Sequence, residues 1–381
     1  MKVMKPFALG VGALLLGVML SSPSWAGATG DVLDSEAAPS DIAALSLLLD
    51  VEKAGSRLVA VGARGHIVYS DDDGKTWAQA KVPVQVLLTG LSFADDKNGW
   101  AVGHGAAVLR TRDGGLTWEK IFDGNKANAY VIDAARKLVT DLEEKVDQAS
   151  DQARGDLEMQ LEEATYAAED AEADSEAGAT KPLLDVWFRN ANEGYVVGAY
   201  GLFFGTRDGG ETWQYLAPML PNPDHFHLNA INALADGSLF IVGEAGQIFR
   251  SIDQGVSWQS IESPYEGSLF GVNGTGVKGQ VLTFGLRGNA FRSEDNGETW
   301  AEVAQDITET LMSGAVGDGG RLVLVGNSGM LLVSSNGGKT FSAHPREDRM
   351  SLTGAMFLSA DRLLLVGEGG VSVIRGIAQL N

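Results

Sequence analysis

The feature that most constrains the fold is a unit of about 42 residues that recurs seven times along the chain. Each unit contains a glycine that closes a short apolar run, and consecutive glycines are 41, 95, 45, 42, 41 and 41 residues apart. Five of these steps share one period, and the long step is that period plus an insertion. A fixed period of this length indicates one supersecondary unit stacked on copies of itself. The seven glycines are Gly62, Gly103, Gly198, Gly243, Gly285, Gly326 and Gly367.

Each unit reads as four short β-strands. In the second unit, short runs rich in apolar residues are separated by turns that contain Gly or Asp-Gly, and the runs are Val86–Phe93, Gly99–Gly103, Ala106–Arg110 and Thr117–Ile121. Short runs closed by such residues are typical of strands. Four strands in a period of about 42 residues are typical of a propeller blade. The sequence therefore predicts an all-β, seven-bladed β-propeller.

A second motif begins eight residues after the glycine in the first six units. It reads Ser/Thr-x-Asp-x-Gly-x-Thr-Trp, as in Ser70–Trp77, with small variations from copy to copy. Its Asp and Ser side chains can accept hydrogen bonds from turn N–H groups, its Gly accepts a positive φ angle, and its Trp can fold back between neighbouring sheets. We therefore predict a structural turn and not a catalytic carboxylate. The residues with this predicted role are Asp72, Trp77, Asp113, Trp118, Asp208, Trp213, Asp253, Trp258, Asp295 and Trp300.

These segments resemble the Asp-box, or bacterial neuraminidase (BNR), repeat. With the Gly-x-x-Gly turn that precedes each box, such as Gly62–Gly65, residues 42–375 outside the insertion resemble the photosystem II stability and assembly factor family of seven-bladed propellers. The resemblance implies a non-catalytic exported protein that binds a membrane-protein complex and assists its assembly. It also implies that the boxes lie away from the binding face.

The seventh unit is incomplete. Its third strand, Val371–Ile374, is followed by a short segment with no box and no aromatic plug. Propellers avoid an open sheet edge, so we expect the N-terminal segment around Asp31–Asp34 to supply a closing outer strand. The alternative is that Ile377–Leu380 completes the blade unaided.

The N-terminus has the pattern of a secretory signal peptide. Lys2 and Lys5 form a basic region, Phe7–Leu20 is apolar, and Ser24–Ala26 fits a cleavage site. The alternative is an uncleaved anchor, but the run is short for a span and no second span of about 20 apolar residues follows. We expect an exported or periplasmic protein with no membrane span after cleavage. It must fold without disulfides, because the chain has no Cys.

One segment interrupts the repeat. Residues 123–182 contain Ala, Glu, Leu and Asp with apolar residues every three or four positions, a helical pattern, and hold 16 acidic and 6 basic side chains. Both ends must return to adjacent blades, so we predict an acidic helical hairpin that turns at Arg154-Gly155. The expected domains are therefore the signal peptide (1–26), blades 1–2 with the closing strand (27–122), the hairpin (123–182) and blades 3–7 (183–381).

The hairpin is expected to share a face with the Gly-x-x-Gly turns, because successive strands of a blade reverse direction. We interpret a projecting hairpin on that face as a docking arm or lid. The alternative is a solvated insertion without function. The residues predicted to contact a partner are Arg64, His104, Tyr200, Glu244 and Arg287 between the paired glycines, and Leu138, Leu142, Leu157 and Leu161 on the hairpin.

No motif for catalysis or for a cofactor emerges from the sequence. It lacks a Gly-rich phosphate loop, a G-x-S-x-G elbow and a His-Glu-x-x-His pair. Glu244 and Glu368 are a conceivable glycosidase pair, and His225 and His227 are conceivable metal ligands, but no second signal supports either. We therefore expect no catalytic residue, no metal and no cofactor. The runner-up function is a glycan-binding or glycoside-hydrolysing Asp-box propeller.

The partner follows from charge and from the resemblance. A formal net charge of -21 argues against nucleic acid as a partner. The resemblance implies a membrane-protein complex, which would be a photosystem II precursor in a photosynthetic cell. Similar bacterial propellers occur with exporters of the RND (resistance-nodulation-division) superfamily, so an RND-type transporter is the expected partner in other cells.

Overall fold

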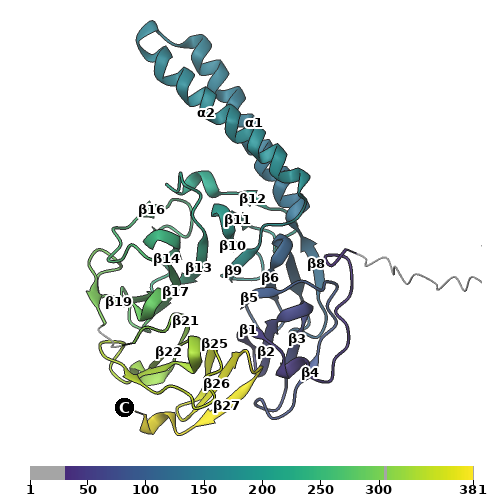
Figure 1. Ribbon diagram of the computed structural model, residues 1–381, viewed down its shortest axis with the longest axis vertical. Helices are drawn as coiled ribbons and strands as arrows, with labels where there is room; N and C mark the ends of the chain where they lie inside the picture. Colours follow the sequence, from purple (N-terminus) through teal and green to yellow (C-terminus); the bar gives the residue numbers. More distant parts are fainter. Residues whose placement is uncertain (1–30, 304–306, 381) are drawn as a thin grey trace, which may run out of the picture. The chain divides into compact units, whose positions relative to one another are not determined.

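The computed structural model of the protein describes residues 31–303 and 307–380, and the predicted signal peptide lies outside these ranges. Residues Asp31–Asn381 form one compact unit, in which seven antiparallel sheets surround a central channel (Figure 1). The predicted seven-bladed propeller is confirmed. Within the described ranges, no helix is both long and apolar enough to cross a membrane.

Among the described residues, six blades have four strands and the seventh has three, numbered outward from the channel in chain order. Blades 1 to 3 consist of β1 (Leu48–Ala54), β2 (Arg57–Gly62), β3 (Ile67–Ser70), β4 (Ala78–Gln79); β5 (Leu88–Phe93), β6 (Gly99–Gly103), β7 (Val108–Thr111), β8 (Glu119–Phe122); and β9 (Leu183–Phe188), β10 (Gly194–Gly198), β11 (Phe203–Thr206), β12 (Gln214–Tyr215). Blades 4 to 7 consist of β13 (Leu228–Ala233), β14 (Leu239–Gly243), β15 (Ile248–Ser251), β16 (Gln259–Ser260); β17 (Leu269–Gly274), β18 (Val281–Gly285), β19 (Ala290–Ser293), β20 (Ala301–Glu302); β21 (Leu311–Val316), β22 (Leu322–Gly326), β23 (Leu331–Ser334), β24 (Ser342–Ala343); and β25 (Leu352–Ser359), β26 (Arg362–Gly367), β27 (Ser372–Arg375).

The hydrophobic core lies between neighbouring blades. Every residue of β6, β14, β18 and β22 is buried, because each blade packs against a neighbour on both faces. The box tryptophans enter these layers, as Trp118 does between Val59 of blade 1 and Leu109 of blade 2. The repeated aromatic residue therefore fills the wedge between two sheets.

The Asp boxes form the turns between the third and fourth strands. In the first box, the Gly74 N–H donates to Ser70 Oγ at 2.9 Å, the Thr76 N–H donates to Asp72 Oδ1 at 2.9 Å and the Thr76 hydroxyl donates to Asp72 Oδ2 at 2.7 Å. Hydrogen bonds from the Thr or Ser at this position hold the pKa of Asp72, Asp253 and Asp295 down to about 2. These carboxylates are therefore fully occupied by their own turns.

An arginine of each blade reaches the next blade on the face that carries the boxes. Six of these arginines contact the backbone or a side chain of the neighbouring box, and Arg321 donates to the Ala360 carbonyl of blade 7, which has no box. The six are Arg57 to Gly114, Arg110 to Gly209, Arg189 to Gln254, Arg250 to Asn296, Arg292 to Gly337 and Arg362 to Asp73. The ring is thus linked from blade to blade, and Arg362 joins the last blade to the first.

The described segment Asp31–Asp34 does not form the expected closing strand, so that prediction is wrong. Asp31–Asp34 lies along blades 1 and 2, where Val32 accepts a hydrogen bond from the Gln85 N–H at 2.8 Å and Asp34 pairs with Lys120 at 2.7 Å. The alternative is wrong too, because Gly376 turns the chain with φ 83° and Ile377–Gln379 forms a 3-10 helix. Blade 7 closes on blade 1 by packing and by Arg362.

We expect Arg362→Ala to lower the free energy of unfolding by about 1 kcal/mol, since two partly exposed bonds to Asp73 are lost. The measurement is urea unfolding of the mature protein. Arg207→Ala is the matched control, because Arg207 is exposed in the third box and shows no ion pair among the described residues. Equal midpoints for the two variants would contradict a role of Arg362 in ring closure.

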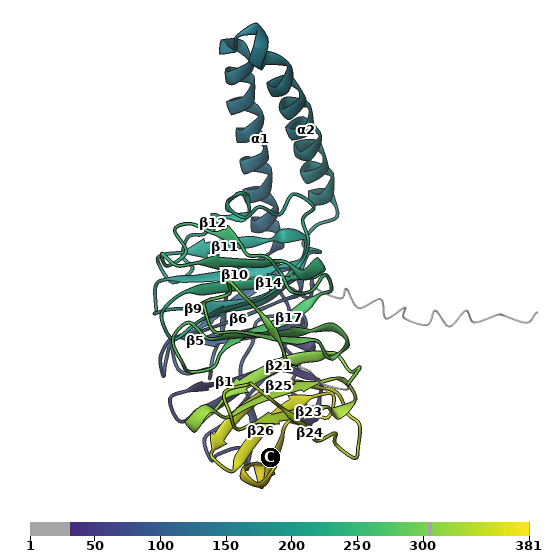
Figure 2. The same cartoon turned by 90° about the vertical axis from the view of Figure 1, so that its left-hand side faces the viewer.

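The inserted segment forms two helices, α1 (Gly124–Gln148) and α2 (Asp151–Glu176), as predicted (Figure 2). The predicted turn at Arg154-Gly155 is wrong, because the helices break at Ala149 and Ser150 and Gly155 lies inside α2. Ser followed by Asp suits the start of a helix. A glycine in an exposed helix costs only about 1 kcal/mol relative to Ala, so it need not mark a turn.

The root of the hairpin is packed into the propeller. Ala127 of α1 is buried in the apolar cluster between blades 2 and 3, and Tyr130 packs against Phe122 and Phe204 with ring centroids 6.2 Å apart in each case. The Asn128 side-chain amide donates to the Gly178 carbonyl at 3.1 Å, which ties the two ends together. The orientation of the hairpin root is therefore fixed by buried contacts.

Candidate functional site

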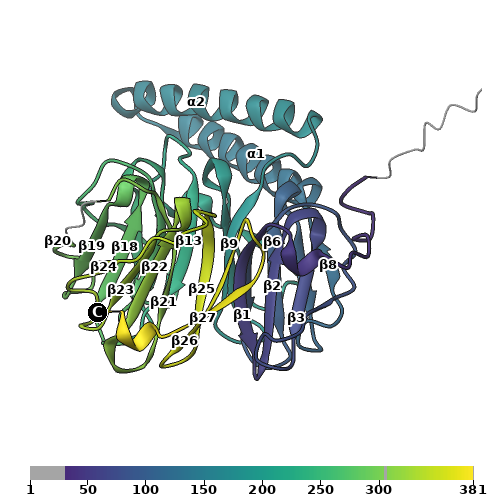
Figure 3. The same cartoon turned by 60° about the horizontal axis from the view of Figure 1, so that its bottom comes forward.

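The candidate site is the face of the propeller that carries the Gly-x-x-Gly turns and the hairpin (Figure 3). Six of these turns are short 3-10 helices between the second and third strands, namely Ala63–Gly65, His104–Ala106, Ala199–Gly201, Glu244–Gly246, Leu286–Gly288 and Asn327–Gly329. The root of α1 lies beside the second turn, since a Cβ on Gly124 would meet the Gly105 carbonyl oxygen at 3.0 Å. The strand-parity argument is therefore correct for the hairpin.

Both glycines of the motif are required by backbone packing. A Cβ on Gly62 would meet the Leu47 carbonyl oxygen at 2.2 Å, and one on Gly65 would meet the Val84 carbonyl oxygen at 2.0 Å. Gly65 also has a φ of +71°, which disfavours other residues. The turns thus press against the links that lead into the inner strands, and only the residues between the glycines are free to face outward.

The structure places all five predicted turn residues on this face. Arg64, His104 and Arg287 are exposed on blades 1, 2 and 5, and no described contact joins them. Tyr200 is 55% exposed and has a φ of +56°, a left-handed conformation that is uncommon for a bulky residue. Glu244 is half-buried. The structure brings only Tyr200 and Glu244 into one cluster.

That cluster, which we call the rim cluster, consists of Asp174, Lys181, Tyr200, His227 and Glu244. Lys181 Nζ lies 2.6 Å from Asp174 Oδ2 at the end of α2 and 5.4 Å from the Tyr200 ring centroid. The Tyr200 and His227 rings are 5.0 Å apart, and His227 Nδ1 lies 3.1 Å from Glu244 Oε2 without the alignment of a hydrogen bond. A continuous chain of contacts thus connects the hairpin with blade 4.

The predicted hairpin leucines divide into two groups. Leu138 is 49% exposed, whereas Leu142 is 5% exposed. Leu157 and Leu161 are half-buried. Leu138 is therefore the most exposed of the four leucines. Tyr166, which sequence reasoning did not select, is 59% exposed on α2.

The channel in the centre of the ring is a cavity of about 690 Å³ lined by the inner strands of all seven blades. His227 of the rim cluster immediately precedes β13, and Asn229 two residues later lines the cavity. The rim cluster therefore borders the mouth of the channel on the hairpin side.

Three carboxylates that sequence reasoning missed line this channel: Asp50, Glu52 and Asp185. Asp50 Oδ2 accepts from the Leu91 N–H at 2.8 Å, and Asp185 Oδ2 accepts from the Ile231 N–H at 2.8 Å, in each case across to the next blade. Each carboxylate retains partial access to water through the channel, although protein atoms surround it.

The surroundings of these carboxylates disfavour their charged forms. Burial, and next to it the nearby charge of Asp50, raise the pKa of Glu52 to about 8. Burial likewise raises the pKa of Asp185 to about 7 and that of Asp50 to about 6. Burial in the channel wall therefore favours the protonated form of each of these carboxyl groups.

An alignment of the repeats contains a signal for two of these residues. Asp50 and Asp185 stand two positions after the buried leucine that opens the inner strand. The other blades have a small residue there, namely Gly90, Ala230, Gly271, Ser313 and Gly354. Comparing the repeats for exceptions, and not only for shared residues, would have identified both carboxylates.

The two glutamates considered as a glycosidase pair, Glu244 and Glu368, each contact other residues and not one another. Glu244 pairs with His227, and Glu368 Oε2 accepts from the Ser351 N–H at 3.1 Å in its own blade. In the part of the chain that the structure describes, no three His, Cys, Asp or Glu side chains are placed to hold a metal ion.

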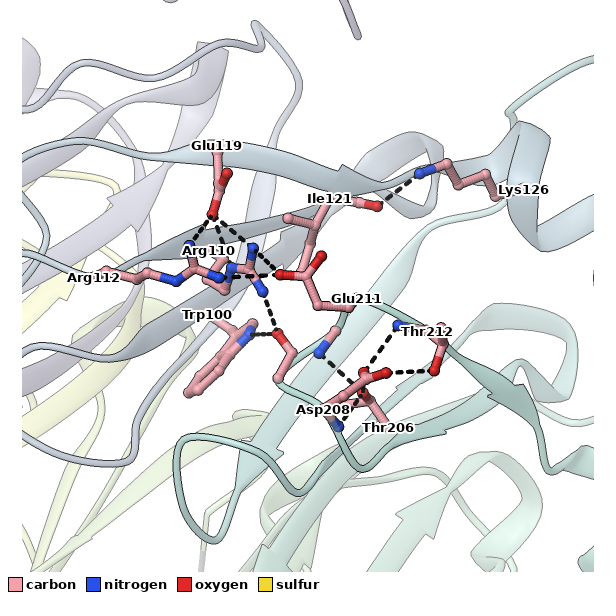
Figure 4. Close-up of polar contacts among 12 residues, drawn as sticks. Trp100, Arg110, Arg112, Glu119, Ile121, Lys126, Thr206, Asp208, Glu211 and Thr212 are labelled. Atoms are coloured by element: carbon pink, nitrogen blue, oxygen red, sulfur yellow. Dashed lines mark hydrogen bonds and ion pairs between the residues drawn. The ribbon is translucent and has the colours of Figure 1, made fainter.

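On the box face, a dense polar junction joins blades 2 and 3 (Figure 4). Arg110 lies 2.8 Å from Glu119 and 2.9 Å from Glu211, and it donates to the Gly209 carbonyl at 3.0 Å. The Trp100 indole N–H donates to the same carbonyl at 3.1 Å. Lys126 of α1 donates to the Ile121 carbonyl at 2.9 Å, which anchors the start of the helix to β8, the strand that also carries Glu119.

Comparison with known proteins is consistent with this architecture. The sequence matches the family described as "Photosynthesis system II assembly factor YCF48" over residues 69–134 and 169–371. Among curated proteins, the Ycf48 photosystem II assembly protein of Thermosynechococcus vestitus is 40% identical over 47 residues, which are 12% of this chain and 14% of that protein. The chloroplastic photosystem II stability/assembly factor HCF136 of Cyanidioschyzon merolae is 44% identical over 48 residues, 12% of this chain and 11% of that protein. The aligned stretches thus span only a small part of these relatives.

Solved structures match over nearly the whole chain. A structure of YCF48 bound to a D1 peptide has a TM-score of 0.60 at 16% identity and covers 87% of this chain and 93% of that one. The structure of YCF48 from Cyanidioschyzon merolae has a TM-score of 0.59 at 15% identity, with coverage of 87% and 96%. At these identities the likeness shows the fold. Since the family match covers most of the sequence and leaves out residues 135–168 of the hairpin, the chain belongs to the family of photosystem II assembly factor YCF48 and has an acidic hairpin outside the matched residues.

Proposed function

We propose that the protein is a non-catalytic, exported assembly factor that binds a subunit of a membrane-protein complex through the face that carries the hairpin. The observation that carries this proposal is the rim cluster, which connects α2 through Lys181 and Tyr200 to the mouth of the channel. The family supports the role, and one solved relative is bound to a D1 peptide. On the box face, the aspartate carboxylates of the turns already accept hydrogen bonds from their own turns.

The proposed partner is a photosystem II precursor if the cell is photosynthetic. An RND-type exporter remains a prediction from sequence resemblance, since the names of the relatives above mention photosystem II and no exporter. In both cases the proposed contacts are Arg64, His104, Tyr200, Glu244 and Arg287 on the turns and Leu138 on α1. In this proposal the more buried leucines of the hairpin, Leu142, Leu157 and Leu161, stabilise the packing of α1 against α2 and do not contact the partner.

The hairpin is the proposed docking arm. Its root is held by buried residues, whereas Leu138 and Tyr166 expose apolar surface farther along. Exposed apolar side chains in a strongly charged segment are a common feature of contact surfaces. A rigid root also reduces the entropy that is lost when a partner is bound.

The test replaces residues 135–168 by a short Gly-Ser loop, which keeps Ala127, Tyr130 and Val131 in the propeller core. We expect a folded protein whose recovery of its partner from detergent-solubilised membranes falls about tenfold, as loss of one or two good contacts would cause. A complete deletion of residues 127–178 should lose the partner as well, but it also removes core residues. Undiminished recovery by the shortened hairpin would contradict the docking arm.

A single-residue variant tests the rim. Tyr200→Gly removes the exposed ring, and glycine suits the left-handed backbone at this position. The variant should therefore recover less partner while its free energy of unfolding stays unchanged. Arg207→Ala on the box face is the matched control and should leave recovery unchanged.

A further inference from the structure

The outer edge of blade 7 is open. β27 pairs with β26 on one side, and no described strand pairs with it on the other. The third strands of blades 2 to 6 are buried at every position, whereas Ser372, Val373 and Ile374 are half-buried and Arg375 is exposed. Blade 7 therefore presents strand surface that every other blade covers with a fourth strand.

The chain on either side of β27 leaves this edge free. Before the strand, the Val371 N–H donates to the Ala44 carbonyl at 2.9 Å. After it, Gly376 turns away, and Ile377 enters the cluster between blades 6 and 7, where it is 1% exposed. Ala43 thus fills the apolar cluster between blades 7 and 1, and Ile377 fills the one between blades 6 and 7. Both clusters are shielded from water, whereas the backbone edge of β27 stays unpaired by any described strand.

The register of blade 1 shows which groups face outward. There, the Ile67 carbonyl accepts from the Ala80 N–H at 2.8 Å, and Tyr69 pairs with Ala78 of the fourth strand. The equivalent positions in blade 7 are Val371 and Val373, because Gly367 of β26 corresponds to Gly62 of β2 and Leu364 therefore pairs with Val373 as Val59 pairs with Tyr69. The Val373 N–H and C=O and the Val371 C=O therefore point away from β26, on the side where the Val371 N–H meets Ala44.

We propose that β27 receives a fourth strand from an extended segment of a partner protein, and that this segment carries a carboxylate side chain opposite Arg375. Strand addition satisfies the backbone groups of an open edge, and side chains then supply selectivity. Arg346 and Arg362 near this edge are each paired with an aspartate of the chain, at Asp348 and Asp73. Arg375 has no such partner among the described residues, so it is the cation available to an incoming carboxylate.

A second copy of the chain fits this edge less well. The open edge offers only four residues, and a stable dimer usually buries about 1,200–2,000 Å². Each copy has a formal net charge of -21, which opposes association of two whole molecules. A short acidic segment needs only the local field of Arg375, because charges beyond about 8 Å are screened at physiological salt. This contact is separate from the hairpin face, so either one can fail without the other.

The experiment adds a blocked hexapeptide of alternating Val and Glu to the mature protein and follows amide hydrogen exchange by NMR. We expect exchange of the Val373 amide to slow at least about tenfold at saturating peptide, as a newly bonded strand amide does. The same peptide with Lys in place of Glu should give no slowing. Arg375→Glu should weaken binding of the Glu peptide about fivefold, and Arg207→Glu on blade 3 should leave it unchanged.

Three results would overturn the proposal. The first is a Val373 amide that exchanges at the same rate with and without the Glu peptide. The second is slow exchange in the free monomer, which would mean that another segment of this chain pairs with β27. The third is slowing that rises with protein concentration alongside a doubled mass, which would identify a second copy as the occupant.

Discussion

Replacing Trp100 by Ala should destabilise the protein by about 3–5 kcal/mol, the usual cost of deleting a buried aromatic side chain. Trp100 is 1% exposed on β6, and its ring stacks on Phe188 of blade 3 with centroids 3.5 Å apart. Its indole N–H donates to the Gly209 carbonyl at 3.1 Å (Figure 4). The substitution would leave a cavity and remove one of two bonds to that carbonyl, since Arg110 supplies the other.

The effect should extend to the hairpin root. Trp100 belongs to the same apolar cluster as Ala127, and Val131 packs against this cluster. Ala127 and Val131 are both part of α1. Urea unfolding gives the free energy, and amide exchange of residues 124–131 reports the root. Trp100→Phe keeps a ring on Phe188 and loses the hydrogen bond, so it should cost about 1–2 kcal/mol. Trp187→Ala is the control, because Trp187 is half-buried on the channel wall and its loss should cost less stability. An equal loss from both variants would contradict a special role of Trp100 in the layer between blades 2 and 3.

The number of blades was predictable because it depends on local repetition. Each copy of the motif needs its own Gly at Gly62 and its equivalents, where the Leu47 carbonyl leaves no room for a side chain. Such a constraint acts within one blade and its link, so it repeats at the same spacing. The inserted helices were predictable for a similar reason, since helical periodicity is also local.

The features that sequence reasoning missed depend on contacts between distant segments. Ring closure involves Arg362 with Asp73 and Ala44 with Val371, and no local pattern connects these pairs. The break between α1 and α2 was misplaced because Gly155 was given more weight than the Ser150-Asp151 helix start. The channel carboxylates were missed because Asp50 and Asp185 lie close together only after the ring has formed.

The channel carboxylates and the Asp boxes have opposite effects on how stability changes with pH. The channel groups lose their contribution as pH rises, and the box aspartates lose theirs as pH falls. The pKa of Glu52 is raised by burial from 4.5 to about 8, so between these values the folded protein holds a proton that the unfolded chain releases. Stability therefore falls as pH rises through this range. The boxes act at the acid end, since the pKa of Asp72 is lowered from 3.8 to about 2 and its contribution is lost as pH falls through that interval. Together they place maximal stability at mildly acidic pH.

Glu52→Gln isolates the channel contribution. Only Oε2 of Glu52 accepts a backbone hydrogen bond, from the Phe93 N–H at 3.1 Å, so the amide oxygen of Gln can replace it. Asp50 and Asp185 are less suitable, because both oxygens of each accept backbone N–H groups. We expect the variant to match the natural protein near pH 5 and to be more stable by about 2 kcal/mol near pH 9, after allowance for the water in the channel.

The difference between the two proteins is the informative quantity, because the boxes and the surface charges are common to both and cancel. It should grow steadily from pH 5 to pH 9 in urea unfolding, following the release of the proton from Glu52. Parallel pH profiles would mean that Glu52 is ionised in the folded protein at neutral pH, which its burial beside Asp50 opposes. A growing difference would show that the channel wall carries at least one neutral carboxyl group at pH 7, so that a ligand entering from the rim cluster meets less negative charge than the sequence suggests.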